Sequence, residues 1–279
     1  MHPTIPPISL LWNARRPTSI LSSVFVEVEG LRLHVEQAGA GPPLLLLHGW
    51  AGSTRAFAPL LPALTPSFAV CAVDFPGCGS SSLPAAPWGV CEYVRCVREL
   101  MRRLGIGQAH VLGHSHGGRV AIALASESPE LVDHLVLVDS AGIRAPRTLR
   151  LRSRGLVARS ARRLLSHPLA GQTGRRALAR VYSWLGMSDY ASAGPLRATL
   201  VRIVNEDLSG LLPQISAPTL VVWGAQDRET PLWMGRQMAR TIPGAEFLLL
   251  ERAGHFSYLE RPEAFQARLL DFLSEPVAS

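Results

Sequence analysis

Short apolar runs that alternate with amphipathic segments constrain the fold of this chain more than any other feature. Six runs have the length of a strand: Leu44–Leu47, Phe68–Val73, His110–Leu112, Leu135–Val138, Thr219–Val222 and Glu246–Leu250. Helical periodicity marks four of the segments between or after them: Val90–Leu104, Gly118–Ser126, Met234–Ile242 and Pro262–Leu273. Continuous apolar runs suit strands that are buried on both faces. The sequence therefore predicts an α/β fold with a mainly parallel, doubly wound sheet.

The N-terminal part of the chain has a different pattern. Phe25–Val28 and Leu31–Glu36 alternate apolar and polar residues on either side of Glu29-Gly30, which predicts an antiparallel hairpin with a two-residue turn. Residues 1–23 are interpreted as an N-terminal extension. Their apolar run, Ile8–Trp12, is short and no small-residue cleavage site follows it, so we do not expect a signal peptide.

The alternation of strands and helices stops between residues 143 and 212. This stretch has no clear strand, and glycines separate its short helical patterns: Gly171, Gly174, Gly186 and Gly194. We interpret residues 143–212 as a helical lid inserted into the core. The core is then expected to consist of residues 24–142 and 213–279.

The net charge of +7 is unevenly distributed. The chain has 28 basic residues, all of them arginine, and eleven lie between Ser140 and Ser188, where there is no acidic residue. The remaining 17 arginines face 21 acidic residues, so the rest of the chain is mildly acidic. The basic segment predicts either a solvated helical face or a peripheral contact with anionic lipids or substrates. It has no base-reading motif or interleaved aromatic residues, which argues against a nucleic-acid partner.

Apolar stretches and cysteines bear on the expected location. The apolar runs are far shorter than the roughly 18 residues that a membrane-spanning helix needs, so we expect no stable membrane insertion. The spacing of the four cysteines matches neither a metal-ligand motif nor a disulfide framework: Cys71, Cys78, Cys91 and Cys96. Free thiols in the reducing cytoplasm are the expectation, with a reactive thiol as the alternative.

A candidate nucleophile lies in Gly113-His114-Ser115-His116-Gly117, directly after the predicted strand at His110–Leu112 and before a predicted helix. Between a buried strand and a helix, this Gly-x-Ser-x-Gly pattern is typical of a sharp turn that exposes the serine hydroxyl. The flanking glycines let the strand and the helix pass close to each other. Ser115 is therefore the candidate nucleophile, and the alternative is a glycine-rich turn with an idle serine.

An acid and a base follow later strands of the same predicted sheet. Asp227 comes after the strand at Thr219–Val222, and His255 comes after the next strand. Both should lie at the carboxyl edge of the sheet, where ligands bind in open α/β folds and where Ser115 also emerges. A serine hydroxyl needs an imidazole to remove its proton, and a carboxylate orients that imidazole. The sequence thus predicts a Ser115–His255–Asp227 triad.

Several motifs together resemble the α/β-hydrolase superfamily over nearly the whole chain after about Val24. They are His48-Gly49-Trp50, Asp74-Phe75-Pro76-Gly77-Cys78-Gly79-Ser80-Ser81, the turn at Ser115, Trp223-Gly224-Ala225-Gln226-Asp227 and Gly254-His255. The resemblance implies an oxyanion hole formed by the backbone N–H groups of Trp50 and His116. It identifies the fold much more specifically than the substrate.

Other residues compete for these roles. Asp139, at the end of a strand, is the alternative acid, and His48, His114 and His116 are alternative histidines near the site. We expect His48 and Asp74 to be structural, bonded to loop backbone. The expected substrate pocket consists of Trp50, His116 and Phe256, and ordinary packing is the alternative for these aromatic residues.

The expected activity is the hydrolysis of small-molecule carboxylic esters through an acyl-enzyme on Ser115, without cofactor or metal. Lactone, amide or carbon–carbon bond hydrolysis on the same residues stays open, as does a ligand-binding protein of the same fold. Dehalogenases and epoxide hydrolases resemble this chain but use an aspartate nucleophile, and residue 115 is a serine.

Overall fold

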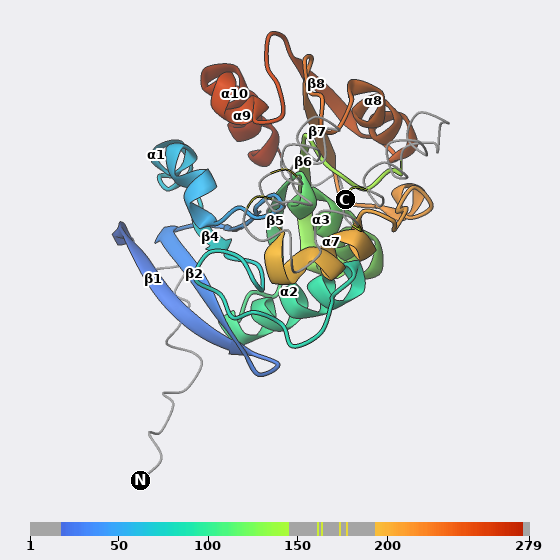
Figure 1. The fold of residues 1–279 in the computed structure, drawn as a ribbon. Helices are drawn as coiled ribbons and strands as arrows, with labels where there is room; N and C mark the ends of the chain where they lie inside the picture. Colours follow the sequence, from blue (N-terminus) through green and yellow to red (C-terminus); the bar gives the residue numbers. More distant parts are fainter. Residues whose placement is uncertain are drawn as a thin grey trace. The chain divides into compact units, whose positions relative to one another are not determined.

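A computed structural model describes residues 18–144 and 193–275, together with the single positions 161, 163, 173 and 177. The described residues form an eight-stranded sheet with the order β1-β2-β4-β3-β5-β6-β7-β8 (Figure 1). The strands are β1 (Thr18–Val28), β2 (Leu31–Gly39), β3 (Pro43–Leu47), β4 (Ala69–Val73), β5 (Ala109–His114), β6 (Val132–Val138), β7 (Thr219–Gly224) and β8 (Glu246–Leu250). The described helices are α1 (Leu61–Leu64), α2 (Val90–Leu104), α3 (His116–Glu127), α7 (Arg197–Ile203), α8 (Leu232–Thr241), α9 (Ser257–Glu260) and α10 (Pro262–Leu273).

Strands β3 to β8 pair in parallel, and β1 and β2 form an antiparallel ribbon at one edge. Every residue of β4, β5 and β7 is buried, as the continuous apolar runs predict. In the β1–β2 hairpin, Val28 pairs with Leu31, and the two turn residues have positive φ, 49° at Glu29 and 79° at Gly30. These angles belong to the turn that suits a two-residue hairpin. The predicted parallel sheet and hairpin are confirmed.

Helices cover both faces of the sheet. Side chains of α9 and α10, including Tyr258, Phe265 and Phe272, pack with Leu112 and Val222 in one buried cluster. On the opposite face, α3 packs on β5 and β6, and α8 packs on β7 and β8. The predicted helices on both faces of the sheet are confirmed. The buried cluster includes side chains of β5 and β7, so it fixes the strands that precede Ser115 and Asp227.

Helix boundaries differ from the prediction where the apolar pattern is weak. Helix α3 begins at His116, directly after Ser115, because the glycines that follow do not prevent helical backbone. Helices α1 and α9 have four residues each, too few for a periodic pattern to be recognised. Strand β1 begins at Thr18, within the segment 1–23 that the sequence assigned to an extension. Residues before Thr18 lie outside the described part.

The chain divides into two compact units, Met1–Ile143 with Glu206–Ser279, and Arg144–Asn205. Most of the second unit, and with it most of the predicted lid over residues 143–212, lies outside the described residues. The helical lid therefore stays a prediction. Its described C-terminal part includes α7, which follows a short 3-10 turn at Gly194–Leu196.

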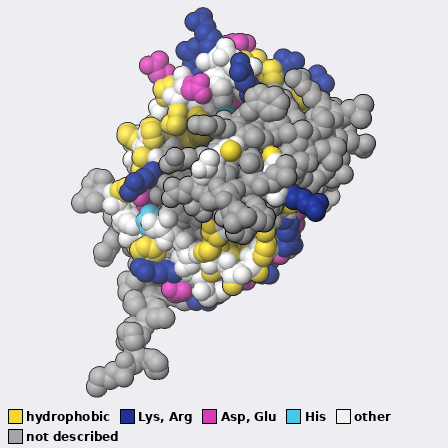
Figure 2. All heavy atoms as spheres, viewed as in Figure 1, with side chains coloured by type: hydrophobic (Ala, Val, Ile, Leu, Met, Phe, Trp, Pro, Cys, Tyr) yellow, Lys and Arg dark blue, Asp and Glu magenta, His cyan; other side chains and the backbone are white. Residues whose placement is uncertain are grey.

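The charged side chains of the described residues are dispersed over the surface that Figure 2 shows. On the face that Figure 2 shows, the dark blue arginines are spread around the margin among magenta acidic groups and do not gather in one patch.

All four cysteines are free thiols. Burial raises the pKa of Cys71 and Cys96 to about 12 and that of Cys78 to about 11, so these thiols stay protonated and unreactive. Among the described residues, every helix is too short or too polar to span a bilayer.

Candidate active site

Ser115 occupies a strained turn between β5 and α3. Its φ is 53° and its ψ is −112°, an uncommon conformation for a residue with a side chain. Backbone hydrogen bonds hold the turn: its N–H donates to the Val138 carbonyl at 3.1 Å, and its own carbonyl accepts from Arg119 at 3.2 Å and Ala141 at 3.0 Å. Such a turn presents a serine hydroxyl at the end of a strand, as the Gly-x-Ser-x-Gly pattern predicts.

The glycines on either side are required by close approach of the backbone. A Cβ atom at Gly117 would overlap the carbonyl oxygen of Leu47 in β3, and one at Gly113 would collide with the backbone of Gly117. Any larger residue at these two positions would push α3 away from the sheet. The two glycines therefore let α3 start directly at the turn.

His255 and Asp227 form a hydrogen-bonded pair in the loops after β8 and β7. The Nδ1 atom of His255 lies 2.9 Å from Oδ2 of Asp227. The other oxygen, Oδ1, accepts the backbone N–H groups of Glu229 at 2.8 Å and Thr230 at 3.0 Å. Because the carboxylate accepts the Nδ1 proton, neutral His255 presents Nε2 as a proton acceptor.

The pair shifts the pKa values of both partners in opposite directions. Burial lowers the pKa of His255, but the hydrogen bond and the charge of Asp227 outweigh burial, so the pKa is raised above 6.5. Burial raises the pKa of Asp227, but the hydrogen bond and charge of His255 and the bonds from Thr230 outweigh it, and the pKa is lowered. Asp227 is therefore ionised at neutral pH, and the protonated form of His255 is stabilised.

His114, the residue before Ser115, forms a hydrogen bond to the loop that carries His255. The Nε2 atom of His114 donates to the backbone carbonyl of His255 at 2.8 Å, and the two rings lie 5.0 Å apart. Within the described part of the chain, Ser115 Oγ has no hydrogen-bond partner, while Nε2 of His255 lies 3.3 Å from Oε2 of Glu229. The structure thus brings His255 and Asp227 into contact but does not form the bond from Ser115 to His255. Such bonds are often long or misaligned in enzymes without substrate.

The backbone N–H groups of Trp50 and His116 are the oxyanion donors that the sequence predicts. Outside helices and strands, neither Trp50 nor His116 donates its N–H to another described residue. His116 is the first residue of α3, where an N–H has no partner within its own helix. Their assignment as oxyanion donors stays a prediction.

The competing residues have structural partners. Asp139, the alternative acid, accepts the N–H of Gly224 at 2.8 Å and of Ser257 at 3.1 Å, and burial raises its pKa to about 7. It therefore ties β7 to α9, and Asp227 is the carboxylate that bonds His255. The expected backbone contacts of His48 and Asp74 are confirmed. His48 donates to the Gly49 carbonyl at 2.7 Å and accepts the Phe75 N–H at 2.9 Å, and Asp74 accepts the N–H groups of Thr54 and Ser80 at 2.7 and 2.8 Å.

The residues of the expected substrate pocket differ in exposure. His116 is buried, and its ring lies 4.8 Å from that of Tyr93 and 5.8 Å from that of Trp50. Both ring nitrogens of His116, the indole N–H of Trp50 and the Tyr93 hydroxyl are buried without a hydrogen-bond partner among the described residues. Phe256 is 46% exposed and packs beside the His255 ring at 5.6 Å. These contacts leave the pocket assignment a prediction.

Three residues contact Asp227 or His255, although the sequence did not predict these contacts. Thr230 lies with its hydroxyl 2.7 Å from Oδ2 of Asp227 and 3.0 Å from the carbonyl of Asp139. His114 bonds the His255 loop, and Glu229 lies beside His255. No motif marks Thr230 or Glu229. Their position within three residues of Asp227 is the one signal that was available.

Comparisons with known proteins agree with this architecture. A family model described as alpha/beta hydrolase fold matches residues 42–262. The chain is 34% identical over 248 residues to a pimeloyl-[acyl-carrier protein] methyl ester esterase of Nitrosomonas europaea, covering 84% of this chain and 96% of the relative. It is 30% identical to a 2-hydroxy-6-oxononadienedioate/2-hydroxy-6-oxononatrienedioate hydrolase of Paraburkholderia phymatum, covering 92% of this chain and 98% of the relative.

A solved structure shows the same arrangement of the chain. The enol-lactonase of Burkholderia xenovorans superimposes with a TM-score of 0.72 at 26% identity, covering 90% of this chain and 100% of that one. The family match extends over most of the chain and includes the strands and loops that carry Ser115, Asp227 and His255. The chain therefore belongs to the α/β-hydrolase family, and this membership identifies it as a hydrolase.

Proposed function

We propose that this protein is a serine hydrolase that cleaves carboxylic esters through an acyl-enzyme on Ser115. The observation that carries the proposal is the 2.9 Å bond from His255 Nδ1 to Asp227 at the sheet edge where Ser115 occupies its strained turn. A carboxylate on Nδ1 makes Nε2 the nitrogen that accepts a proton, which is what activation of a serine requires.

The proposed reaction has two halves. Ser115 Oγ attacks the ester carbonyl, its proton passes to Nε2 of His255, and that proton then protonates the departing alcohol. Water attacks the acyl-enzyme next, gives its proton to Nε2, and releases the acid while Ser115 regains its proton. The N–H groups of Trp50 and His116 would stabilise the oxyanion, each by roughly 3 kcal/mol. For the first step, Nε2 must turn from Glu229 toward Ser115.

The names of the relatives support ester cleavage and also a second candidate. The Nitrosomonas europaea relative is named as a methyl ester esterase. The Paraburkholderia phymatum relative is named as a hydrolase of an oxo-dienedioate, and the superimposed structure is an enol-lactonase. Unpartnered polar groups of His116, Trp50 and Tyr93 favour a substrate with a polar group near the scissile bond. Lactone or carbon–carbon bond hydrolysis on the same residues is therefore the second candidate.

The test is turnover of a substrate panel by the wild type and by Ser115→Ala. The panel combines p-nitrophenyl esters of increasing chain length, methyl monoesters of dicarboxylic acids, lactones and a vinylogous 1,5-diketone acid. We expect ester turnover to fall at least about 1000-fold in the variant. Full activity of Ser115→Ala would show that another nucleophile acts. Labelling of Ser115 by a fluorophosphonate without turnover of any substrate would favour a ligand-binding protein.

Location and partners belong to the same proposal. We place the protein in the cytoplasm, where the four free cysteines stay reduced. The eleven arginines between Ser140 and Ser188 are proposed to attract anionic substrates or lipid surfaces. Turnover and liposome binding that do not change with ionic strength would argue against this role.

A further inference from the structure

A second cluster of chemically competent side chains lies at the opposite edge of the sheet from Ser115. His110 is the second residue of β5, and Asp133 and His134 are the second and third residues of β6. The two strands are parallel neighbours, so their first residues share the amino edge of the sheet. Ser115, which follows β5, lies at the carboxyl edge, so the cluster is separate from the candidate active site.

An irregularity in the strand register explains how three such residues meet. Ala109 pairs with Val132, and Val111 pairs with Leu135. One residue of β5, His110, therefore faces two residues of β6. Successive side chains of a regular strand point to opposite faces, whereas an extra residue in one strand redirects its side chain. The bulge allows Asp133 and His134 to approach the same partner.

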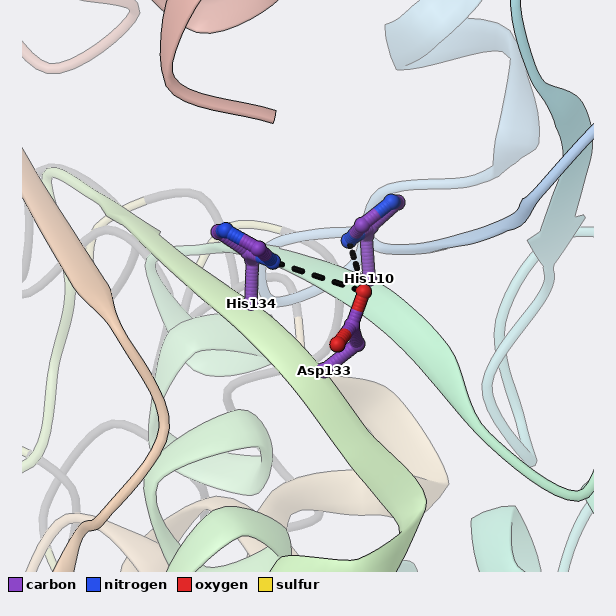
Figure 3. Close-up of side chains that lie close together, drawn as sticks. All are labelled: His110, Asp133 and His134. Atoms are coloured by element: carbon purple, nitrogen blue, oxygen red, sulfur yellow. Dashed lines mark ion pairs between the residues drawn. The ribbon is translucent and has the colours of Figure 1, made fainter. Parts of the chain in front are cut away.

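The three side chains converge on one another (Figure 3). Oδ2 of Asp133 lies 3.2 Å from Nδ1 of His110 and 3.4 Å from Nδ1 of His134. One possible ligand atom from each of the three residues lies within 4.8 Å of the other two. Both Nδ1 atoms are buried, yet neither has a hydrogen-bond partner among the described residues, because the carboxylate is near but not aligned. Buried polar nitrogens without a hydrogen bond are rare, and a bound ion is one arrangement that satisfies them.

Aromatic rings pack against both histidines, and the carboxylate is the most exposed of the three side chains. The His110 ring packs edge-on against Phe68 at 5.5 Å and His134 at 5.0 Å, and the His134 ring packs against Phe272 at 5.2 Å. The two histidines are 4% and 2% exposed, whereas the Asp133 side chain is 31% exposed. Asp133 is therefore the member of the cluster that solvent reaches most easily.

We propose that His110, Asp133 and His134 bind a divalent transition-metal ion, Zn²⁺ in the first place. Zinc takes imidazole nitrogen and carboxylate oxygen at about 2.0–2.2 Å in tetrahedral geometry, which places neighbouring ligand atoms about 3.3 Å apart. The separations of 3.2 and 3.4 Å match this spacing, and the distance between the two histidine ligand atoms, which is within 4.8 Å, would shorten when the ion binds. Water completes the shell on the side of Asp133. The ion would bridge β5 and β6 and so stabilise the fold. This structural role does not depend on the proposed hydrolase activity.

The experiment uses the full chain after metal is removed with a chelator. Zn²⁺ binding is measured by calorimetry and thermal unfolding, and Co²⁺ is used as a spectroscopic probe because tetrahedral Co²⁺ absorbs strongly in the visible. We expect one metal equivalent in the wild type that is lost in Asp133→Asn and in His110→Gln. Saturating Zn²⁺ should raise the melting temperature of the wild type by roughly 5 °C. Glu130→Gln, the same charge change at an exposed residue in the turn before β6, should behave as the wild type.

Two results would overturn the proposal. One is a wild type that binds no Zn²⁺ or Co²⁺, which would make the cluster an ordinary ion pair of Asp133 with its histidines. The other is an Asp133→Asn variant that binds as many equivalents as the wild type, which would place the metal elsewhere. Asp133→Asn is the decisive variant because its partly exposed side chain tolerates substitution better than the buried His110. Ester hydrolysis is measured in parallel, and we expect Asp133→Asn to retain it.

Discussion

At the scale of single residues, His255 stands between two acidic side chains with different effects. Asp227 holds Nδ1 from a buried position, and Glu229, whose side chain is 63% exposed, lies 3.3 Å from Nε2. Asp227 orients the ring and raises the pKa of His255. Glu229 also raises this pKa, but it contacts the nitrogen that must receive the proton of Ser115. Glu229 is therefore expected to stabilise the protonated form of His255 and in this way to tune the base.

Glu229→Gln should move the acidic limb of the kcat/KM profile to lower pH. Removal of the negative charge lowers the pKa of His255, so the neutral base persists at lower pH. Because Glu229 is exposed and screened by water, we expect a shift of about a few tenths of a pH unit, larger at low salt. The measurement is a pH–rate profile at two ionic strengths, with Glu263→Gln on the exposed side of α10 as the control. An unchanged profile at low salt would contradict this role.

At the scale of elements, the junction of β5 and α3 decides where the hydroxyl of Ser115 lies. The helix starts one residue after the turn, and its first residues run along the end of β3. The backbone of Leu47 leaves no room for a side chain at Gly117. The positive φ of Ser115 is kept because strand, turn and helix are all anchored by backbone hydrogen bonds.

Gly117→Ala should destabilise the protein strongly, whereas Gly107→Ala should not. A methyl group at Gly117 meets a backbone carbonyl that cannot move without shifting β3, so we expect a loss of about 3 kcal/mol or more. A methyl group at Gly107 meets no atom within 4 Å, and we expect a change within about 1 kcal/mol. Urea unfolding of both variants measures the difference. Equal stability of the two would mean that α3 can move away from the sheet at little cost.

At the scale of the whole molecule, buried titratable groups link stability to pH. His48, His114 and His116 are buried, and burial lowers the pKa of each below 6.5, for His114 to about 3. These histidines stay neutral in the folded protein but bind protons when the chain unfolds in acid. Asp139 acts in the opposite direction, because burial raises its pKa to about 7 and the unfolded carboxyl titrates near 3.8.

The free energy of unfolding should fall as the pH drops below about 6.5. The contribution of each lowered histidine is complete above its unfolded pKa and is lost as the pH falls toward its folded pKa. Asp139 contributes stability that is present below its unfolded pKa and lost as the pH rises through about 7, and His255, whose pKa is raised, acts in the same direction. The histidines with a lowered pKa outnumber these two groups, since burial also lowers the pKa of His110. His114→Gln should flatten the dependence between pH 5 and 6 by about 1 kcal/mol per pH unit. Urea unfolding at several pH values measures it, and an unchanged slope would show that His114 is protonated in the folded state.

Local sequence pattern determined the elements and the order of the candidate catalytic residues. Apolar runs such as Leu44–Leu47 identify buried strands because burial on both faces is a property of a few adjacent residues. The turn at Ser115 was recognisable because its glycines and its place between strand and helix are also local. Asp227 and His255 followed from their positions after consecutive strands, since parallel strands bring their carboxyl ends to one edge.

Tertiary structure alone decided which groups contact one another. Asp139 and Asp227 both follow strands, and only the folded chain shows that Asp227 bonds His255 while Asp139 ties β7 to α9. The bulge that places Asp133 and His134 opposite His110 likewise depends on how β5 pairs with β6. Register, side-chain direction and close approach are set between residues far apart in the sequence, so no local pattern contains them.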